Sequence, residues 1–317
     1  MTGVEVDEAV AAPGVAGVFT GADVAEMGLA PNVLPMFPDA MRRPYVAADV
    51  VRYQGQPVVA VVAETQAQAV DATELVIVDY EPLAPVTDPE AAAQDGVLIF
   101  GDHGTNVLSH MESPAAADFS ECEVVVSERI VNQRLTAAPI EGRTGMTQRM
   151  ITGTYEFGNV GFSADVVVTN TVPITAYRGA GRPEAAVAIE RMVDRFAAEI
   201  GMDPAEVRSR NLVPKFTEPY VTAMGTSYDV GDYPEALRRA LDAVGYDELR
   251  AAQCERRERG DTPLLGIGIA QGVAQALLEG IQYDEGGNLL TGNFMDYLVI
   301  SAAELPSFEV VHIETPT

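Results

Sequence analysis

The 317-residue chain has few of the residues that build metal clusters. Its two cysteines, Cys122 and Cys254, lie far apart and form no CxxC pair, so neither an iron–sulfur cluster, a zinc ribbon nor a disulfide framework is expected within this chain. The three histidines, His103, His110 and His312, have no ligand-like spacing. We therefore predict no metal site built from side chains of this chain.

The sequence also lacks any apolar run near 18 residues, and its opening residues show no charged segment followed by an apolar one. We therefore expect neither a secretory signal nor membrane insertion, and a reducing cytoplasmic setting is the default expectation. Lysine occurs once, at Lys215, whereas Asp and Glu number 47 and the formal net charge is −27. Phosphates would be repelled over most of such a surface, so nucleic acid and anionic membranes are not expected as partners.

Apolar residues, in contrast, are plentiful. Hydrophobic residues make up 47% of the chain and aromatic residues 7%, which is ordinary for a globular protein that buries a sizeable core. The length is sufficient for two domains.

Periodicity becomes clear after a first stretch of short irregular pieces. Residues 57–63 form an apolar run of strand length, Thr65 can cap a short helix with Gln68 at the capping-box position, and residues 75–80 read as a second strand. Strand, helix and strand over about 25 residues predict a small mixed sheet with a helix packed on it. A small, polar linker follows at residues 113–118, and residues 124–131 alternate weakly as a further strand.

The most informative stretch runs from Asp165 to Asn211. The β-branched run at residues 166–168 predicts a strand, which is followed by a glycine-rich turn and an amphipathic helix that begins near Pro183 and ends at Gly201. The residues expected on the buried face of this helix are Ile189, Met192, Val193, Phe196 and Ile200.

Two capping signals follow this helix. Asp203 is the expected N-cap of the next helix, with Glu206 placed to reach back to the N–H group of the cap. Asp232 and Glu235 repeat this pattern at the start of a helix that places Leu237, Leu241 and Val244 inward and ends at Gly245.

The turn at residues 176–182, AYRGAGR, lies between the predicted strand end and helix start. Its small residues allow a ligand close to the backbone, the helix start favours an anion, and two arginines add guanidinium donors. A phosphate-bearing cofactor fits this chemistry. The alternative is a turn whose arginines lie in water or pair with acidic residues. A Rossmann fingerprint is disfavoured, because GAGRPE lacks the third glycine and Pro183 removes an N–H group.

Several segments resemble one known family. They are TNTVPITAYRGAGRPEAAVAIERMVDRFAAEIGMDPAEVRSRNLV, RPYVAADVVRYQGQPVVAVVAETQAQAVDATELVIVDYEPLAPVTDPEAA, VNQRLTAAPIEGR and QGVAQALLEGIQYDEGGNLLTGNFMDYLVISAAELP. The chain resembles the molybdopterin-binding large subunits of the xanthine dehydrogenase, aldehyde oxidase and carbon monoxide dehydrogenase (molybdenum hydroxylase) family. The resemblance implies an α+β protein with an N-terminal α/β hammerhead domain, residues 1–112, followed by a truncated, incomplete molybdopterin-binding α+β domain, residues 113–317.

The resemblance also assigns roles to residues of two loops. Arg178 matches the arginine that faces the molybdenum centre and orients an oxygen, so it is the expected catalytic residue. The expected cofactor-binding residues are Ala176, Tyr177, Gly179, Ala180, Gly181, Gln271 and Gly272. Gln271 would contact the amide edge of the pterin, although without the resemblance it reads as an ordinary helix-start residue.

The implied activity is hydroxylation of an aldehyde, purine or N-heterocycle carbon with oxygen derived from water. The implied cofactor is molybdopterin, in the form of molybdopterin cytosine dinucleotide, and electrons would pass to iron–sulfur clusters and FAD. Since this chain lacks cluster cysteines, those centres would lie on an iron–sulfur small subunit and an FAD-binding medium subunit. Gly179 stands where carbon monoxide dehydrogenases carry a copper-binding cysteine, so a homologue of that enzyme's large subunit is the less favoured alternative.

Three features of the family are missing between Met1 and Thr317: a GGGFG-type loop, a GQG-type loop and a glutamate in a G-E motif that acts as general base. A join at residues 268–270 would account for part of this difference. We therefore expect an internally shortened large subunit, and a catalytically inactive remnant that still binds partners is the alternative to an active enzyme.

Overall fold

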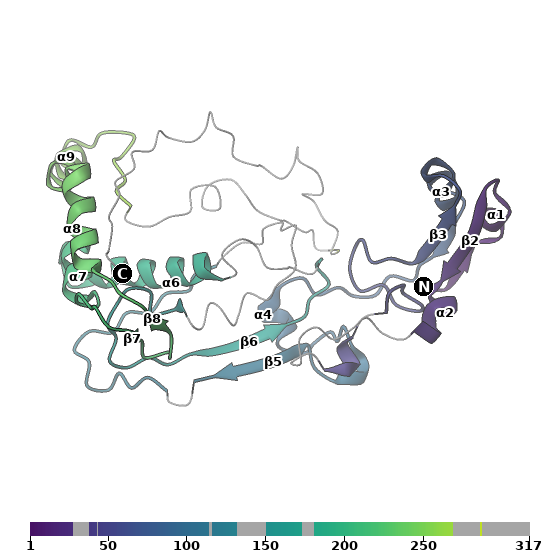
Figure 1. Cartoon of the computed structure of the whole chain (residues 1–317), viewed down its shortest axis with the longest axis horizontal. Coiled ribbons are helices and arrows are strands. Elements are labelled where there is room, and N and C mark those ends of the chain that lie inside the picture. The colour runs from purple at the N-terminus through teal and green to yellow at the C-terminus, as the bar shows by residue number, and fades with distance from the viewer. Residues whose placement is uncertain are drawn as a thin grey trace. The chain divides into compact units, whose positions relative to one another are not determined.

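A computed structural model describes residues 1–27, 38–42, 44–113, 116–131, 150–172, 181–268 and Gly286. The chain forms two compact units, whose elements are labelled in Figure 1. As far as the chain is described, residues 1–111 and 163–172 belong to the first unit, and residues 112–162 and 181–268 belong to the second. The division into domains after residue 112 stays a prediction.

The described strands of the first unit form two-stranded sheets. These pairs are β1 (Gly3–Glu5) with β4 (Ile77–Asp79), β2 (Val15–Thr20) with β3 (Val59–Ala63), and β5 (Val107–Glu112) with β6 (Ser163–Val167). The first two pairs are antiparallel, and β2 carries an irregularity between Val15 and Gly17. The helices of this unit are short: α1 (Asp7–Ala11), α2 (Gly21–Val24), α3 (Gln66–Thr73) and α4 (Pro89–Ala92), with 3₁₀ turns at Ala25–Met27, Asp39–Met41 and Gly101–His103.

The predicted elements of this unit are confirmed, but their expected pairing is wrong. Strand β3 lies within residues 57–63, β4 within residues 75–80, and the Thr65 hydroxyl caps α3 by accepting a hydrogen bond from the Gln68 N–H group at 3.3 Å. Instead of sharing a mixed sheet, β3 and β4 each pair with a strand that precedes them in the chain. Periodicity identifies a strand but carries no information about its partner.

A core packs beneath β5 and β6. Its buried residues are Met41, Val86, Ala92, Ile99, Phe100 and Leu108, and Val166, Val167 and Val168 pack against them. Asn106 lies fully buried beside this core and holds three loop segments together. Its side-chain amide donates to the carbonyl oxygens of Ala92 (3.0 Å) and Val97 (2.7 Å), and its side-chain oxygen accepts from the Ile99 N–H group (3.0 Å).

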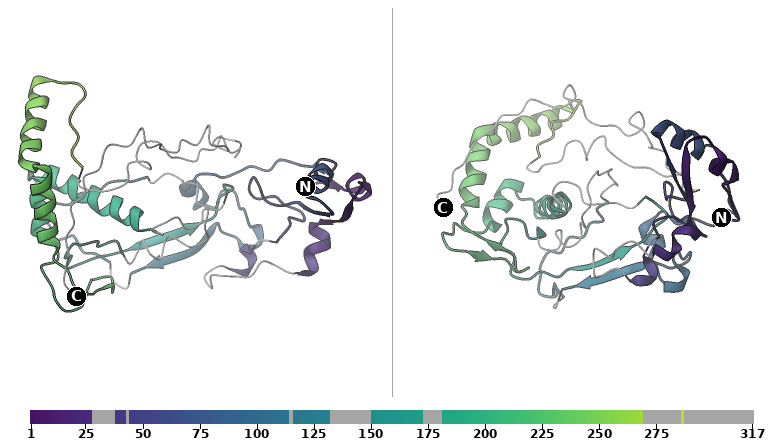
Figure 2. Two further views of the ribbon diagram at one scale, coloured as in Figure 1. Left: turned by 45° about the horizontal axis from the view of Figure 1, so that its top comes forward. Right: turned by 45° about the vertical axis from the view of Figure 1, so that its right-hand side comes forward.

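The second unit is mainly helical. Its elements are α6 (Arg182–Glu199), α7 (Pro204–Asn211), β7 (Tyr220–Val221), β8 (Ser227–Tyr228), α8 (Tyr233–Val244) and α9 (Tyr246–Arg259). Figure 2 shows α8 and α9 following one another with only a short break. A second core joins α6 and α7, with Tyr155, Val193, Ala197 and Val207 buried and Ile189, Phe196 and Leu212 packed against them.

Helix α6 has the predicted limits. Pro183 lies in its first turn, and Gly201, with φ of +66°, follows its last residues in the left-handed conformation that favours glycine. Val193 is buried on the predicted face and Ile189, Met192 and Phe196 are partly buried there, but Ile200 is exposed, because the helix ends at that position.

The predicted N-caps of α7 and α8 are confirmed. The Asp203 carboxylate accepts from the N–H groups of Ala205 (2.8 Å) and Glu206 (3.4 Å), and that of Asp232 accepts from the Glu235 N–H group (3.2 Å). The Glu206 side chain pairs with Arg210 one turn further along the helix.

Two further predictions in this unit are wrong. Residues 124–131 form no strand, and Val125 (58% exposed) and Val131 (65% exposed) face solvent, so the weak alternation does not produce a buried face. Of the residues expected inward on α8, Leu237 and Leu241 are partly buried, but Val244 is 59% exposed, and no residue of this helix is fully buried. The apolar spacing predicts correctly that α8 is a helix, but it does not determine how deeply the apolar face of that helix is buried.

We expect Asp203→Ala to lower the free energy of unfolding by about 2 kcal/mol, because it removes an N-cap and the hydrogen bonds that Tyr246 (3.1 Å) and Arg250 (2.9 Å) donate to the same carboxylate. Urea unfolding followed by circular dichroism measures the change. Asp203→Asn is the control: it keeps a capping oxygen and should lose less than half as much. Equal losses in both variants would contradict a capping role.

Candidate functional site

The structure describes the last two residues of the predicted turn, Gly181 and Arg182. Gly181 is buried, has φ of +102° and is the N-cap of α6, and its carbonyl oxygen accepts from the Ala185 N–H group at 3.1 Å. A side chain is rarely accommodated at this φ, so the backbone here requires glycine. The other predicted site residues, Ala176, Tyr177, Arg178, Gly179, Ala180, Gln271 and Gly272, lie outside the described residues, and their roles stay predictions.

The first turn of α6 has the features of an anion site. The N–H groups at the start of an 18-residue helix have no partner within the helix, and the helix dipole adds partial positive charge there. Arg182 is exposed at the first helical position and contributes a full positive charge. Pro183 removes one N–H group, so the site has fewer backbone donors than a helix start without proline.

Four aromatic side chains gather around β7, β8 and the start of α8. Phe216, Tyr220, Tyr228 and Tyr233 have neighbouring ring centroids 5.6–6.5 Å apart, and the Tyr228 hydroxyl donates to the Gly153 carbonyl oxygen at 2.6 Å. Burial raises the pKa of Tyr228, and the positive charge of Arg182 acts in the opposite direction.

A buried ionic cluster crosslinks α6 and α7, and we did not predict it from the sequence. Arg208 is 3% exposed; its Nε donates to Glu190 Oε2 (2.8 Å), and one terminal nitrogen donates to Asp194 Oδ1 (2.8 Å). The Tyr155 hydroxyl donates to Glu190 Oε1 at 2.9 Å. The four-residue spacing of Glu190 and Asp194 is the sequence signal that could have indicated one charged stripe on α6.

Electrostatics fix the protonation states in this cluster. Burial lowers the pKa of Arg208, but the hydrogen bond and charge of Asp194, together with the charge of Glu190, outweigh that effect and raise it, so the guanidinium stays positive. Burial, followed by the negative charge of Glu190, raises the pKa of Tyr155, so its hydroxyl keeps its proton and donates. The cluster therefore acts as a fixed set of hydrogen bonds and not as an acid or base.

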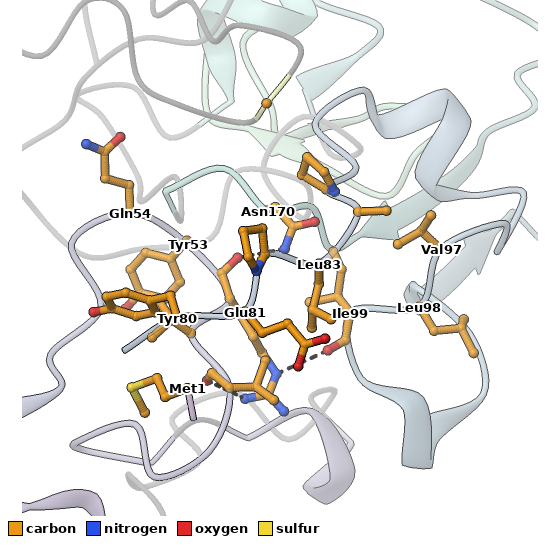
Figure 3. Close-up of a pocket in the computed structure, with 17 residues that line it drawn as sticks. Met1, Tyr53, Gln54, Tyr80, Glu81, Leu83, Val97, Leu98, Ile99 and Asn170 are labelled. Atoms are coloured by element: carbon orange, nitrogen blue, oxygen red, sulfur yellow. Dashed lines mark hydrogen bonds between the residues drawn. The ribbon is translucent and has the colours of Figure 1, made fainter. Parts of the chain in front are cut away.

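A separate cavity of about 590 Å³ lies within the first unit. Figure 3 shows its lining, which includes Tyr53, Tyr80, Leu83 and Ile99. Arg52 lines it as well, but the guanidinium is already held: Nε donates to the Ile99 carbonyl oxygen (3.1 Å), and the group lies 4.6 Å from the centre of the Phe100 ring. Gly181, the predicted site residue that the structure describes, does not line this cavity.

Within the part of the chain that the structure describes, no group of three His, Cys, Asp or Glu side chains is arranged to hold a metal ion. In the same part, no helix is both long enough and apolar enough to cross a membrane.

Three family models match the chain. Residues 1–84 match the aldehyde oxidase and xanthine dehydrogenase a/b hammerhead domain, and residues 144–212 and 265–306 each match a molybdopterin cofactor-binding domain. The match at residues 144–212 contains the predicted turn, α6, α7 and the ionic cluster.

Relatives and solved structures agree with these matches. The carbon monoxide dehydrogenase large chain of Hydrogenophaga pseudoflava is 44% identical over 120 residues, 37% of this chain and 15% of that protein. The nicotine 6-hydroxylase large subunit of Paenarthrobacter nicotinovorans is 24% identical over 408 positions, covering 85% of this chain and 50% of that protein. Quinoline 2-oxidoreductase from Pseudomonas putida 86 superposes with a TM-score of 0.70 at 22% identity, covering 82% of this chain and 50% of that chain.

These comparisons confirm the expected α+β fold with a hammerhead domain. The chain spans half or less of the length of these three relatives. The alignment with the nicotine 6-hydroxylase subunit runs over 408 positions although this chain has 317 residues, so that relative carries additional residues between the matched parts.

Proposed function

Because this chain belongs to the family of molybdopterin-binding large subunits of xanthine dehydrogenase, aldehyde oxidase and carbon monoxide dehydrogenase, we propose that it binds a molybdopterin cofactor and forms part of a molybdenum-dependent hydroxylase. The observation that carries this proposal is the match of residues 144–212 to a molybdopterin cofactor-binding domain. That segment contains the arginine-bearing glycine turn and the helix start to which the turn leads.

The described residues fit an anionic cofactor. Gly181 offers backbone without a side chain, and the first turn of α6 supplies helix-end N–H groups together with the Arg182 charge. In this proposal Ala176, Tyr177, Gly179, Ala180 and Gly181 line the cofactor with backbone, and Gln271 and Gly272 contact its pterin edge. The cytosine dinucleotide form of the cofactor is part of the proposal.

The proposed reaction is hydroxylation of an aldehyde, purine or N-heterocycle carbon with oxygen from water. The cofactor, when bound, supplies the oxygen-transfer and redox chemistry. The contribution of this chain is to hold the cofactor, to exclude water around it and to orient a reacting oxygen with the Arg178 guanidinium. Electrons would leave through an iron–sulfur small subunit and an FAD-binding medium subunit, because the chain has only two widely separated cysteines.

Carbon monoxide oxidation is the less favoured reaction. The 44% identical relative is a carbon monoxide dehydrogenase large chain, which supports it. Gly179, however, has no thiol that could bind copper. Its presence argues against a copper site in this chain and for an aldehyde, purine or N-heterocycle substrate.

A cofactor-binding remnant without activity is the second candidate. The length of the alignment with the nicotine 6-hydroxylase subunit supports it, because residues between the matched parts of that relative have no counterpart here. A remnant would retain the docking surfaces of the large subunit and lack turnover.

Molybdenum analysis tests whether the chain binds the cofactor, and turnover separates an active enzyme from the remnant. We expect the chain, produced in a host that makes the cofactor, to carry close to one molybdenum and one pterin per chain by elemental analysis and by fluorescence of the oxidised pterin. A folded chain with neither would refute cofactor binding.

In a chain that turns over, Arg178→Ala should reduce kcat by about a hundredfold or more with little change in thermal stability. Steady-state assays with aldehyde, purine and N-heterocycle substrates, together with thermal scans, measure the two effects. Arg191→Ala, an exposed position on α6, is the matched control and should leave both unchanged. Equal kcat in the Arg178 variant and in the control would refute the role of Arg178. A molybdenum-loaded chain without any turnover would identify the remnant.

A further inference from the structure

We propose that Arg208 is a positioning residue for the anion site at the start of α6: together with Glu190, Asp194 and Tyr155 it sets the placement of α6, and thereby of its N-cap Gly181. This inference rests on the proposed function for its cofactor part. Its structural part concerns only the described residues of the second unit.

The first step is that the Arg208 guanidinium donates hydrogen bonds to both α6 and α7. Besides its bonds to the carboxylates of Glu190 and Asp194, its terminal nitrogens donate to the backbone carbonyl oxygens of Glu190 (3.3 Å) and Pro204 (3.1 Å). The Nη2 atom of Arg208 also lies 2.7 Å from Glu190 Oε2, the oxygen that accepts from Nε. One buried side chain therefore binds the backbone and the side chains of α6 and the first turn of its own helix, and this fixes the position of α6 against α7.

The second step is that this attachment lies far enough from the turn to act only through other groups. Glu190 follows Gly181 by nine residues, which at 1.5 Å per residue is about 14 Å along the axis of α6. The helix is unbroken over that length, and Ile189, Val193 and Ala197 pack into the core on either side of Glu190. A displacement of Glu190 along the axis therefore displaces Gly181 by a similar amount.

The third step is that the cluster also holds the segment before α6. The Tyr155 hydroxyl binds Glu190, and the Tyr155 N–H group closes a turn by donating to the Thr152 carbonyl oxygen (3.1 Å). Within that turn the Gly153 carbonyl oxygen accepts from the Tyr228 hydroxyl at 2.6 Å. Tyr155 therefore joins α6, at Glu190, to the Thr152–Tyr155 turn and, through Gly153, to β8.

Two conservative substitutions test the proposal. Arg208→Lys keeps the charge but cannot reproduce the planar set of donors, and Tyr155→Phe removes a single hydroxyl. Arg210→Lys is the matched control, because Arg210 lies on the same helix, is 60% exposed and pairs only one turn away with Glu206. All three variants would be made in the full chain, and thermal scans would establish that each is folded.

The first measurement is hydrogen exchange of the amides at residues 185–188, the first N–H groups that are hydrogen-bonded within α6, compared with those at residues 196–200 at the other end of the helix. We expect exchange at the helix start to increase at least severalfold in Arg208→Lys and Tyr155→Phe and to stay unchanged in Arg210→Lys. Unchanged exchange at the start of α6 in both cluster variants would overturn the proposal, and so would an equal increase at the two ends, which is what general destabilisation produces.

The second measurement is retention of molybdenum and pterin in the purified holoprotein during dialysis. Loss should be on the order of tenfold to a hundredfold faster in the two cluster variants than in the wild type and in Arg210→Lys, in the range found when groups that support a ligand are removed. Wild-type retention in both variants would overturn the cofactor part. A wild-type chain that never carries molybdenum would refute the proposed function and the cofactor part together, and the exchange measurement would still decide the placement of α6.

Discussion

Replacement of Arg208 by alanine is expected to lower the free energy of unfolding by about 3–5 kcal/mol. The Glu190 carboxylate, which is only 21% exposed and lies beside a buried tyrosine, loses its counter-charge in this variant. The hydrogen bonds that the guanidinium donates to the Pro204 and Glu190 carbonyl oxygens are lost as well. Urea unfolding followed by circular dichroism measures the change. Arg210→Ala, at an exposed ion pair on the same helix, should change the value by less than about 1 kcal/mol.

A double substitution makes this prediction sharper. Glu190→Gln with Arg208→Met removes both charges, so the pair should cost clearly less than the sum of the two single variants. Additive losses would show that the two side chains do not interact in solution. A loss below about 1 kcal/mol for Arg208→Ala would show that the arginine is not buried as described.

The second large effect is expected at Asn106 in the first unit. Asn106→Ala should lower the free energy of unfolding by about 3–5 kcal/mol, because the carbonyl oxygens of Ala92 and Val97 and the N–H group of Ile99 each lose a hydrogen bond at once. The same urea experiment measures it, and Asn159→Ala, at an exposed asparagine, should change the value by less than about 0.5 kcal/mol.

The Asn106→Asp variant distinguishes the effect of losing the amide hydrogen bonds from the effect of losing side-chain volume. The carboxylate has nearly the shape of the amide, but its second oxygen would face the carbonyl oxygens of Ala92 and Val97, so the loss should be at least as large as that of the alanine variant. A stable aspartate variant at neutral pH would show that the amide donors contribute little, and the loss at alanine would then be a packing effect.

Local signals in the sequence predicted the elements that depend on local interactions. Thr65, Asp203 and Asp232 cap the helices they were expected to cap, because a cap is formed within three residues. Pro183 and Gly201 delimit α6 for the same reason. The family resemblance, in turn, predicted the hammerhead fold that the family models identify.

Features that depend on distant parts of the chain could not be predicted in this way. The pairing of β1 with β4 joins residues more than 70 positions apart, and periodicity does not encode a partner. In the sequence, Arg208 is one of several charged residues on α7. Its burial results from the packing of α6 against α7, which the sequence does not show. In the cofactor turn, five of the six predicted site residues lie outside the described chain, so among them Gly181 alone shows how the turn enters the helix.

The Asp203 carboxylate joins two helices that are distant in the sequence. It caps α7 and also accepts from Tyr246 and Arg250 of α9, which are 43 and 47 positions away in the chain. Loss of this one carboxylate would weaken both the start of α7 and the attachment of α9, so the stabilities of the two helices are coupled.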